Sequence, residues 1–400
     1  MPGSVIVAGA RTPIGKLLGA LSSLSAVDLG AHTIHAALAA VHLEPTAVEA
    51  VVMGHVVQAG AGPNPARQAA IQAGIPFSVP ASTVNKLCPS GLHAIALADL
   101  MVASGRHEVV VAGGMESMSN APHLLRGART GWKYGSAAAE DALDRDALVC
   151  AFDGVSMGAA TERRQRPFDL TREEQDEYSA LSHQRAAQAQ ESGSLSEEIT
   201  PVTVAGRLGE TVVADDEGVR PGTTGESLGR LKPAFSDAGT ITPGNASQLS
   251  DGAAAVLVMS AERARREGLT PLAEIGAYGT VAGPDPSLLI QPAGAIHDAL
   301  SRDGRLKTAD LDLFEINEAF ASVALASVRE LGIPLDKVNV NGGAIALGHP
   351  VGMTGARLVL TLAAELRRRG GGSGAAALCG GGGQGDALLL HVPTPARTRS

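Results

Sequence analysis

The chain has 400 residues, of which 44% are hydrophobic, 2% are aromatic and 49 are glycine, and its formal net charge is −9. This negative balance argues against nucleic acid as the main partner, because nucleic-acid binding needs a basic surface. The length allows two or three domains with large cores, and the Ala/Gly/Val-rich composition favours closely packed helices and sheets.

The sequence lacks recognisable signals for targeting, membrane insertion, disulfide formation and zinc binding. The N-terminus runs directly into an apolar segment, without a charged leader or a cleavage-site pattern. No apolar stretch approaches the length of a membrane span. The three cysteines, Cys88, Cys150 and Cys379, form neither a disulfide framework nor a zinc-ligand spacing. We therefore expect a cytoplasmic protein that binds no metal and has no membrane partner.

The first 114 residues alternate between strand-like and helix-like patterns. The periodicity predicts strands over 4–8, 50–57 and 108–112 and helices over 25–41, 65–73 and 92–104. Pro65 is suited to a first helical position, and Gly74 closes the same helix. The last of these strands ends in a Gly-Gly pair. Such alternation is typical of a layered α/β fold.

Residues from about 115 to 248 break this alternation. A helix is predicted over 171–192, and the segment 220–235 is rich in turn-forming residues and contains three cations, Arg220, Arg230 and Lys232. We interpret this region as an insertion of helix and loop that lies over the core.

From Ser250 the alternation resumes. It predicts strands over 253–260, 272–278, 313–316, 338–341, 374–379 and 387–392, helices over 292–301, 318–331 and 355–369, and a frayed tail over 393–400. A weak internal repeat is also present. Cys88 and His349 each lie on a turn before an apolar helix, which is followed by a strand ending in glycines. If the repeat is real, two similar halves place Cys88 and His349 at equivalent corners of one cleft.

Three side chains carry the candidate chemistry. Cys88 comes just before a predicted helix, where the N–H groups and the helix dipole favour an anion and should lower the pKa of the thiol. An unperturbed thiol is mostly protonated at pH 7, so it needs a base, and His349 on its Gly-His-Pro turn could be that base. Cys379 opens a glycine-rich segment whose bare backbone would admit a substrate, and it could donate and accept protons.

Each of these residues taken alone also has a purely structural interpretation. Cys150 is interpreted as an inert buried thiol, and Cys88 or Cys379 by itself could be the same. His349 could be a satisfied histidine in a tight turn. Asn317, in the segment AsnGluAlaPhe, could place an amide at a cleft or merely cap the following helix.

Taken together, the motifs of this chain resemble those of the thiolase family, and in particular its acetyl-CoA acetyltransferases. They are, in chain order, VIVAGARTPIGK, VNKLCPSGLHA, AGGMESMSNAP, RPGTT…LKPAF, GNASQLSDGAAAV, NEAF, NGGAIALGHPVGMTGAR and LCGGGGQG. The resemblance covers nearly the whole chain. So many motifs in one order favour a catalytic role for Cys88, His349 and Cys379 over the structural interpretations.

The resemblance implies an α/β fold with a five-layered αβαβα core from two similar halves and an inserted helix and loop domain. Residues 1–118 with 249–270 would form the N-terminal half, 119–248 the loop domain that binds coenzyme A, 271–393 the C-terminal half and 394–400 a tail. It also implies a homo-oligomer, either a dimer or a tetramer.

The activity that the resemblance implies is acetyl-CoA C-acetyltransferase. Two acetyl-CoA molecules would condense reversibly to acetoacetyl-CoA and CoA, by a ping-pong mechanism through an acyl-cysteine. Cys88 would carry the acyl group, His349 would take its proton, and Cys379 would act as acid and base. One oxyanion hole would use His349 with a water held by Asn317, and the second would use the backbone N–H groups of Cys88 and Gly381.

Coenzyme A thioesters would be substrates, with no permanently bound cofactor. Pantetheine contacts map onto Met157 and Ser247, and contacts at the adenine end map onto Arg220 and Ser227. Arg220 also suits the local basic patch that an anionic ligand requires in a protein with negative net charge.

The chain departs from the family pattern at four places. These are Ser156 in place of a frequent histidine, residues 288–292 in place of Met-Gly-x-Gly-Pro, glycine after Cys379, and Pro243 before GlyAsnAlaSer. The first two alter pocket walls, so a broader-chain 3-ketoacyl-CoA thiolase of fatty-acid β-oxidation remains an alternative.

Two further alternatives are weaker. A ketoacyl synthase or hydroxymethylglutaryl-CoA synthase would need other helper groups in place of the second cysteine. A non-catalytic CoA- or lipid-binding subunit conflicts with the intact set of Cys88, His349 and Cys379.

Overall fold

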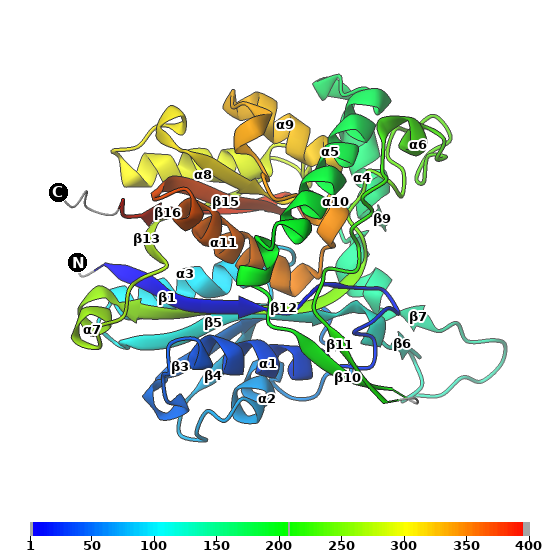
Figure 1. The fold of residues 1–400 in the computed structure, drawn as a ribbon. Coiled ribbons are helices and arrows are strands. Elements are labelled where there is room, and N and C mark those ends of the chain that lie inside the picture. The colour runs from blue at the N-terminus through cyan, green and yellow to red at the C-terminus, as the bar shows by residue number, and fades with distance from the viewer. Residues whose placement is uncertain (1–2, 207–208, 395–400) are drawn as a thin grey trace.

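The computed structural model describes residues 3–206 and 209–394, and two helices lie at its centre between two groups of strands (Figure 1). The central helices are α3 (Ser90–Ala103) and α11 (Val351–Arg368). The N-terminal group of strands consists of β1 (Ser4–Arg11), β12 (Ser250–Ser260), β5 (Val109–Ser117), β3 (Ala50–Gly54) and β4 (Ala81–Val84). The C-terminal group consists of β13 (Ala273–Ala282), β16 (Gln384–Val392), β15 (Gly372–Gly380) and β14 (Leu313–Ile316).

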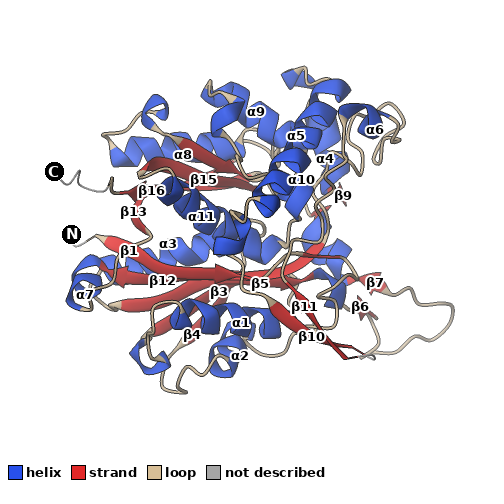
Figure 2. Cartoon of the chain, viewed as in Figure 1, coloured by secondary structure: helices blue, strands red, loops and turns tan. Residues whose placement is uncertain are grey.

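Helices cover the outer face of each group of strands (Figure 2). On the N-terminal side these are α1 (Ala26–Ala39) and α2 (Pro65–Gln72), and on the C-terminal side α8 (Gln291–Asp303) and α9 (Ala321–Leu331). The order of layers is therefore helix, sheet, helix, sheet, helix. The predicted α/β fold with a five-layered αβαβα core is confirmed.

The two groups of strands have the same plan. The strand order is β14-β15-β16-β13-β1-β12-β5-β3-β4, and the groups meet where β13 pairs with β1 through only two residue pairs, Val5 with Glu274 and Ile6 with Ala273. Outward from this junction, each group has two antiparallel pairings and then a parallel one. Because α3 precedes β5 and α11 precedes β15, the weak repeat in the sequence corresponds to two similar halves.

The first turns of α3 and α11 lie against each other. A Cβ atom added to Gly91 would lie 2.9 Å from the backbone nitrogen of Ala356, and one added to Gly355 would lie 2.4 Å from that of Leu92. Only glycine allows backbones to approach so closely. The contact brings the N-termini of both helices together, and these are the ends next to Cys88 and His349.

The segment between β5 and β12, which is inserted within the N-terminal half, holds further helices and a hairpin. They are α4 (Met157–Arg164), α5 (Arg172–Glu191), α6 (Gly225–Gly229), and β10 (Val202–Gly206) paired with β11 (Gly209–Val213). The hairpin was not predicted, since most of its residues are exposed and only three of its valines, Val202, Val204 and Val213, pack on the core. The remaining short elements are β2 (Gly15–Lys16), β6 (His123–Leu124), β7 (Glu140–Asp141), β8 (Val149–Cys150), β9 (Val155–Ser156), α7 (Ala261–Arg266) and α10 (Ala344–Leu347).

A buried carboxylate joins the inserted segment to the C-terminal half. Glu318 accepts hydrogen bonds from Tyr178 at 2.9 Å and Ser182 at 2.7 Å, both on α5, and from the backbone N–H of Ile345 at 3.0 Å. A carboxylate with this many donors is stable in the interior. The insertion is thereby held over the core, while the predicted domain boundaries stay predictions.

The predicted strand over 338–341 is wrong. Only Val338 makes a bridge, to Phe314, and Asn339 has a left-handed backbone with φ of +47°. The Asn339 side chain instead bonds to the edge of β14, accepting from the N–H of Ile316 at 2.8 Å and donating to its carbonyl at 2.7 Å. A side-chain amide thus replaces the expected strand pairing.

Several predicted ends also differ, among them the end of the strand predicted over 50–57, which stops at Gly54, and the start of the helix predicted over 355–369, which begins at Val351. The helix predicted from residue 318 begins at Ala321, so Asn317 does not cap it. The strand predicted to end at residue 112 continues to Ser117, through Gly113 and Gly114. A Cβ added to Gly114 would lie 1.9 Å from the carbonyl oxygen of Gly352, so this strand fits beneath α11 only without a side chain there.

Most of the predicted tail, residues 395–400, lies outside the described residues. Among the helices of residues 3–206 and 209–394, none combines the length and apolar composition that crossing a bilayer requires.

Candidate active site

Cys88 lies on a tight turn that leads into α3. The preceding residue, Leu87, has a left-handed backbone with φ of +54°, a conformation that costs about 1 kcal/mol for a residue with a side chain. Ser90 holds the turn, because its Oγ accepts from the N–H of Lys86 at 2.8 Å and donates to the carbonyl of Leu87 at 2.6 Å. The turn presents Cys88, which is partly buried, at the helix start.

The Cys88 thiol is protonated in the resting protein, contrary to the expectation of a lowered pKa. Burial raises the pKa of Cys88 to about 11, although the N–H groups of Gly381 and of Cys88 itself act in the opposite direction. The charge of Glu116 raises it further. The helix start therefore does not ionise the thiol at pH 7, and a base is required for the sulfur to react.

His349 has the properties of that base. It lies between α10 and α11, and burial, followed by the charge of Arg357, lowers its pKa to about 3. Thr354 Oγ1 donates to the carbonyl of Pro350 at 2.9 Å and lies 2.6 Å from His349 Nδ1, so Nδ1 carries the proton. The imidazole is therefore neutral at pH 7, with its Nε2 lone pair free to accept a proton.

Thr354 is a site residue that the sequence interpretation missed. Its only signal is its place five residues after the histidine on the first turn of α11. A hydroxyl there can reach back to the ring, but only the structure shows that it does.

Asn317 contacts the same histidine. Its Nδ2 lies 3.4 Å from His349 Nε2, and its backbone N–H donates to Ala377 in β15 at 2.9 Å. The Oδ1 atom is buried and has no hydrogen-bond partner among the described residues. An unpaired buried acceptor is costly, so this oxygen suits a water or a substrate group.

Cys379 lies at the end of β15 and is fully buried. It belongs to an apolar cluster that includes Leu288, Leu289 and Phe320. Burial raises the pKa of Cys379 well above its usual range, and the charge of Cys88 raises it further. All three cysteines lie within the described residues and are free thiols.

Two glycines after Cys379 let its loop approach the Cys88 turn. A Cβ added to Gly380 would lie 2.9 Å from Cδ of Pro89. One added to Gly381 would lie 2.8 Å from Cδ1 of Leu87 and 2.6 Å from Cε of Met157. Because these positions carry no side chain, the Gly381 amide can face the Cys88 sulfur.

A cavity of about 320 Å³ reaches His349. Of the predicted coenzyme A contacts, Met157 and Ser247 line it, together with Ser156 and an apolar wall of Met118, Leu148, Phe235, Leu249, Phe320 and Val351. Cys88 and Cys379 are not among the lining residues. Such an apolar cavity with a few polar groups is typical of small-molecule sites.

The structure does not bring Arg220 and Ser227 to this cavity. Both are exposed on the inserted segment. The Ser227 Oγ donates to the carbonyl of Thr224 at 2.8 Å, and the Ser227 N–H donates to Thr224 Oγ1 at 3.1 Å in the cap of α6. Arg220 donates its backbone N–H to His183 Nδ1 at 3.2 Å, which leaves its side chain at the surface.

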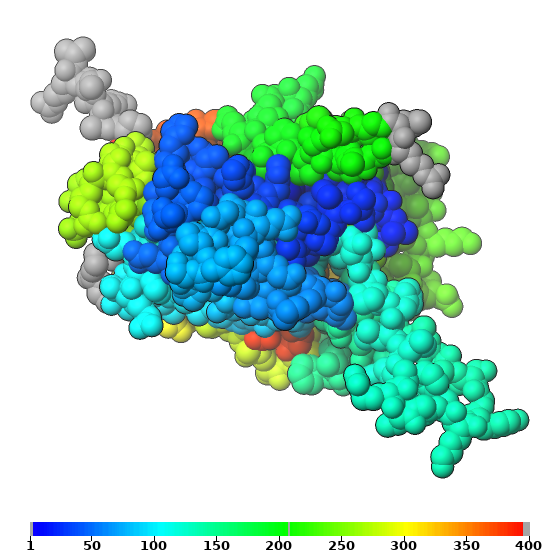
Figure 3. Space-filling model, turned by 90° about the horizontal axis from the view of Figure 1, so that it is seen from below, coloured from blue at the N-terminus to red at the C-terminus, as the bar shows by residue number. Residues whose placement is uncertain are grey.

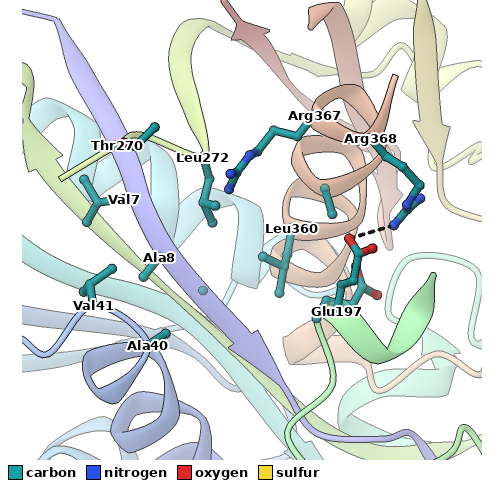
Figure 4. A pocket seen from close by; sticks show the side chains of 13 residues that line it. Val7, Ala8, Ala40, Val41, Glu197, Thr270, Leu272, Leu360, Arg367 and Arg368 are labelled. Atoms are coloured by element: carbon teal, nitrogen blue, oxygen red, sulfur yellow. Dashed lines mark hydrogen bonds and ion pairs between the residues drawn. The ribbon is translucent and has the colours of Figure 1, made fainter. Parts of the chain in front are cut away.

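The largest cavity described, of about 520 Å³, lies elsewhere (Figure 4). It runs between β1, the end of α1 and the last turns of α11, where Arg368 pairs with Glu197 at 3.2 Å and Arg367 points across the opening. It contains none of the predicted site residues. Size alone is therefore a poor guide to the reactive centre of this molecule.

Within the described residues, no group of three or more His, Cys, Asp or Glu side chains is arranged to hold a metal ion. The described chemistry consists of two neutral thiols, a neutral imidazole and backbone N–H groups directed at a sulfur. This set is suited to acyl transfer through a thioester.

Comparison with known proteins gives a consistent result. The family model described as "Thiolase, N-terminal domain" matches residues 4–262, and "Thiolase, C-terminal domain" matches residues 269–392. A "Probable acetyl-CoA acetyltransferase" of Mycobacterium leprae is 57% identical over 391 residues, covering 98% of this chain and 99% of the relative. An "Acetyl-CoA acetyltransferase" of Cupriavidus necator is 49% identical over 366 residues, covering 91% and 93% of the two chains. A "Probable acetyl-CoA acyltransferase" of Staphylococcus epidermidis is 45% identical over 364 residues, covering 90% and 92%.

Proposed function

This chain belongs to the thiolase family, and on that premise we propose that it is an acetyl-CoA C-acetyltransferase. It condenses two acetyl-CoA molecules to acetoacetyl-CoA and CoA, and it catalyses thiolysis in the reverse direction. The observation that carries the proposal is the close approach of the Cys88 turn to the Cys379 loop, one from each half, in a molecule whose His349 is neutral.

In the first half-reaction, His349 Nε2 takes the proton of Cys88, and the thiolate attacks the acetyl carbonyl carbon. The bond from this carbon to the CoA sulfur breaks, and CoA leaves with a proton from Cys379. The products are acetyl-Cys88, an imidazolium and a Cys379 thiolate. The direction of each pKa supports these roles, because His349 is neutral before the reaction and both thiols are protonated.

In the second half-reaction, the Cys379 thiolate takes a methyl proton from a second acetyl-CoA. Burial makes this thiolate a strong base, which suits the weak acidity of a carbon acid. The enolate carbon attacks the carbonyl of acetyl-Cys88, the bond to the Cys88 sulfur breaks, and that sulfur regains its proton from His349. The cycle returns each residue to its starting protonation state, since the Cys379 proton lost with CoA is replaced by the methyl proton.

Two sets of donors would stabilise the oxyanions. The enolate oxygen would bind His349 and a water on the unpaired Oδ1 of Asn317, and the acyl oxygen would bind the N–H groups of Cys88 and Gly381. Donors of this kind are each worth about 3 kcal/mol of barrier.

Coenzyme A would enter along the cavity that reaches His349. Met157 and Ser247 would contact pantetheine there, and Arg220 and Ser227 would meet the nucleotide end at the surface. The exposure of Arg220 suits contact with a phosphate, since the remaining protein carries net negative charge.

Thiolysis of 3-ketoacyl-CoA substrates from four carbons upward tests the substrate class. We expect a steep fall in kcat/KM beyond acetoacetyl-CoA, because Leu288, Leu289 and Phe320 already fill the space around Cys379. Steady-state rates at 25 °C with each chain length give the profile. If eight- and sixteen-carbon substrates react as fast as acetoacetyl-CoA, the result would instead favour the broader-chain thiolase.

We further propose that the protein is a homo-oligomer, a dimer or a tetramer, in the cytoplasm. The segment from β6 to β7 projects from the body of the molecule, and Leu125, Trp132 and Tyr134 on it are exposed (Figure 3). Exposed apolar side chains on a projecting arm favour contact with another copy. A monomer mass from light scattering would contradict the proposed homo-oligomer. Cell fractionation tests the proposed cytoplasmic location.

A further inference from the structure

A buried ion pair joins the two halves beside the cysteines. Lys86 Nζ lies 2.7 Å from Asp386 Oδ1, with side-chain exposures of 18% and 0%. Asp386 also accepts from Tyr278 Oη at 2.7 Å and Thr280 Oγ1 at 2.8 Å, and the His93 ring lies 3.9 Å away. None of the catalytic steps proposed above uses a residue of this cluster.

Each partner of the pair is next to a cysteine-bearing segment. Lys86 is two residues before Cys88 on the turn that leads into α3. Asp386 on β16 lies opposite Leu378 in the strand register, and its neighbour Gly385 lies opposite Cys379. The ion pair therefore links the backbone of the Cys88 turn to the pair of strands that ends in the Cys379 loop.

The Cys88 turn and the Cys379 loop contact each other mainly through glycine backbone, so an ion pair between the two segments helps to fix their relative position. Pro89 packs on Gly380, and Leu87 packs on Gly381 while holding its left-handed conformation. A left-handed residue with a side chain persists only where its surroundings fix it. Ser90 fixes the turn from its own half, and Lys86 joins it to the other half through its ion pair with Asp386.

We propose that Lys86 and Asp386 are positioning residues that set the placement of the Cys88 turn against the Cys379 loop, so that the Gly381 amide faces the Cys88 sulfur. They touch neither substrate nor the reacting atoms. Their effect falls on thiolate formation and acyl transfer and leaves coenzyme A binding largely unchanged. The inference rests on the proposed role of Cys88 as the nucleophile.

The variant Lys86→Met is expected to lower the rate of acetyl-enzyme formation by about 100-fold, the usual consequence of an ångström-scale misplacement of reacting groups. Because the Gly381 donor moves away from the sulfur, the pH profile of Cys88 alkylation by iodoacetamide should move to higher pH. Two other ionisable groups act on Cys88, namely Cys379 and Glu116, and both are unchanged in this variant. The KM for acetyl-CoA should stay near the wild-type value, and Lys86→Arg should restore part of both effects.

The experiment measures the CoA burst from acetyl-CoA and the alkylation profile on the purified full-length protein. Lys337→Met is the matched control, since Lys337 donates to the carbonyl of Leu311 at 2.9 Å and lies on neither cysteine segment. It should leave both readouts at wild-type values. If Lys86→Met does not fold, the double variant Lys86→Gln/Asp386→Asn replaces it, because it leaves no buried charge without a partner. The same two measurements are then made on this double variant.

A wild-type burst and an unmoved alkylation profile in these variants would overturn the proposal. A slower burst with an unmoved profile and a raised KM would also overturn it, since the pair would then serve binding. If wild-type protein forms no acetyl-enzyme, the proposed function fails, whereas the alkylation profile still decides whether the ion pair acts on Cys88.

Discussion

Replacement of Cys88 by alanine is expected to abolish both acetyl-enzyme formation and turnover. The loss in kcat should be about 10⁴-fold or more, because removing the nucleophile of a covalent mechanism removes the whole reaction path. Incubation with acetyl-CoA labelled in the acetyl group, followed by denaturation and counting, measures the adduct. The same preparation gives turnover from the release of CoA.

Cys150→Ala is the matched control for this variant. Cys150 is the third free thiol, and it is buried on β8, outside the proposed chemistry. It should leave both readouts close to wild type. An undiminished labelled adduct in Cys88→Ala would exclude Cys88 as the acyl carrier, and with it the proposed mechanism.

Replacement of Cys379 by alanine should separate the two half-reactions. The protein should still become acetylated on Cys88, because CoA can leave as a thiolate without an acid. Condensation should fall by about 10³-fold, the usual size of a general acid–base contribution. Single-turnover transfer from preformed acetyl-enzyme to a second acetyl-CoA, monitored by acetoacetyl-CoA formation, checks this.

The reverse reaction gives an independent check on the same variant. Thiolysis of acetoacetyl-CoA needs a proton donor for the leaving enolate, so it should be slowed to a similar extent. Normal condensation in Cys379→Ala would remove Cys379 as the acid and base. Parallel loss of acetylation and condensation would mean that the acetylation step cannot proceed without the proton that Cys379 gives to the leaving CoA.

Much of the fold could be predicted because its signals are local. The strand over 313–316 and the helix started by Pro65 follow from short apolar runs and from a start signal within them. The failure at 338–341 has a nonlocal cause, since Asn339 satisfies the edge of β14 with its side chain. The hairpin of β10 and β11 was missed because pairing between exposed strands leaves little hydrophobic pattern.

For the candidate site too, some properties could be predicted from the sequence and others could not. The residue types of Cys88, His349 and Cys379 could be identified from the sequence, but their protonation states could not. A helix start suggested a lowered thiol pKa, whereas burial by segments far along the chain raises it to about 11. Thr354, which fixes the histidine tautomer, was invisible for the same reason, since its role depends on how α11 begins.

The glycine contact between α3 and α11 has a kinetic consequence. Cys88 and His349 are each joined directly to one of these buried helices, and the helices meet backbone to backbone at Gly91 and Gly355. Close-packed interiors have low compressibility, so the helix pair should hold the proposed nucleophile and the proposed base at a fixed separation. If Cys88 and His349 act as proposed, we expect acyl transfer to start without a preceding closure of one half on the other. Evolution of new acyl specificities is correspondingly confined to the cavity walls, where side chains can change without moving this rigid centre.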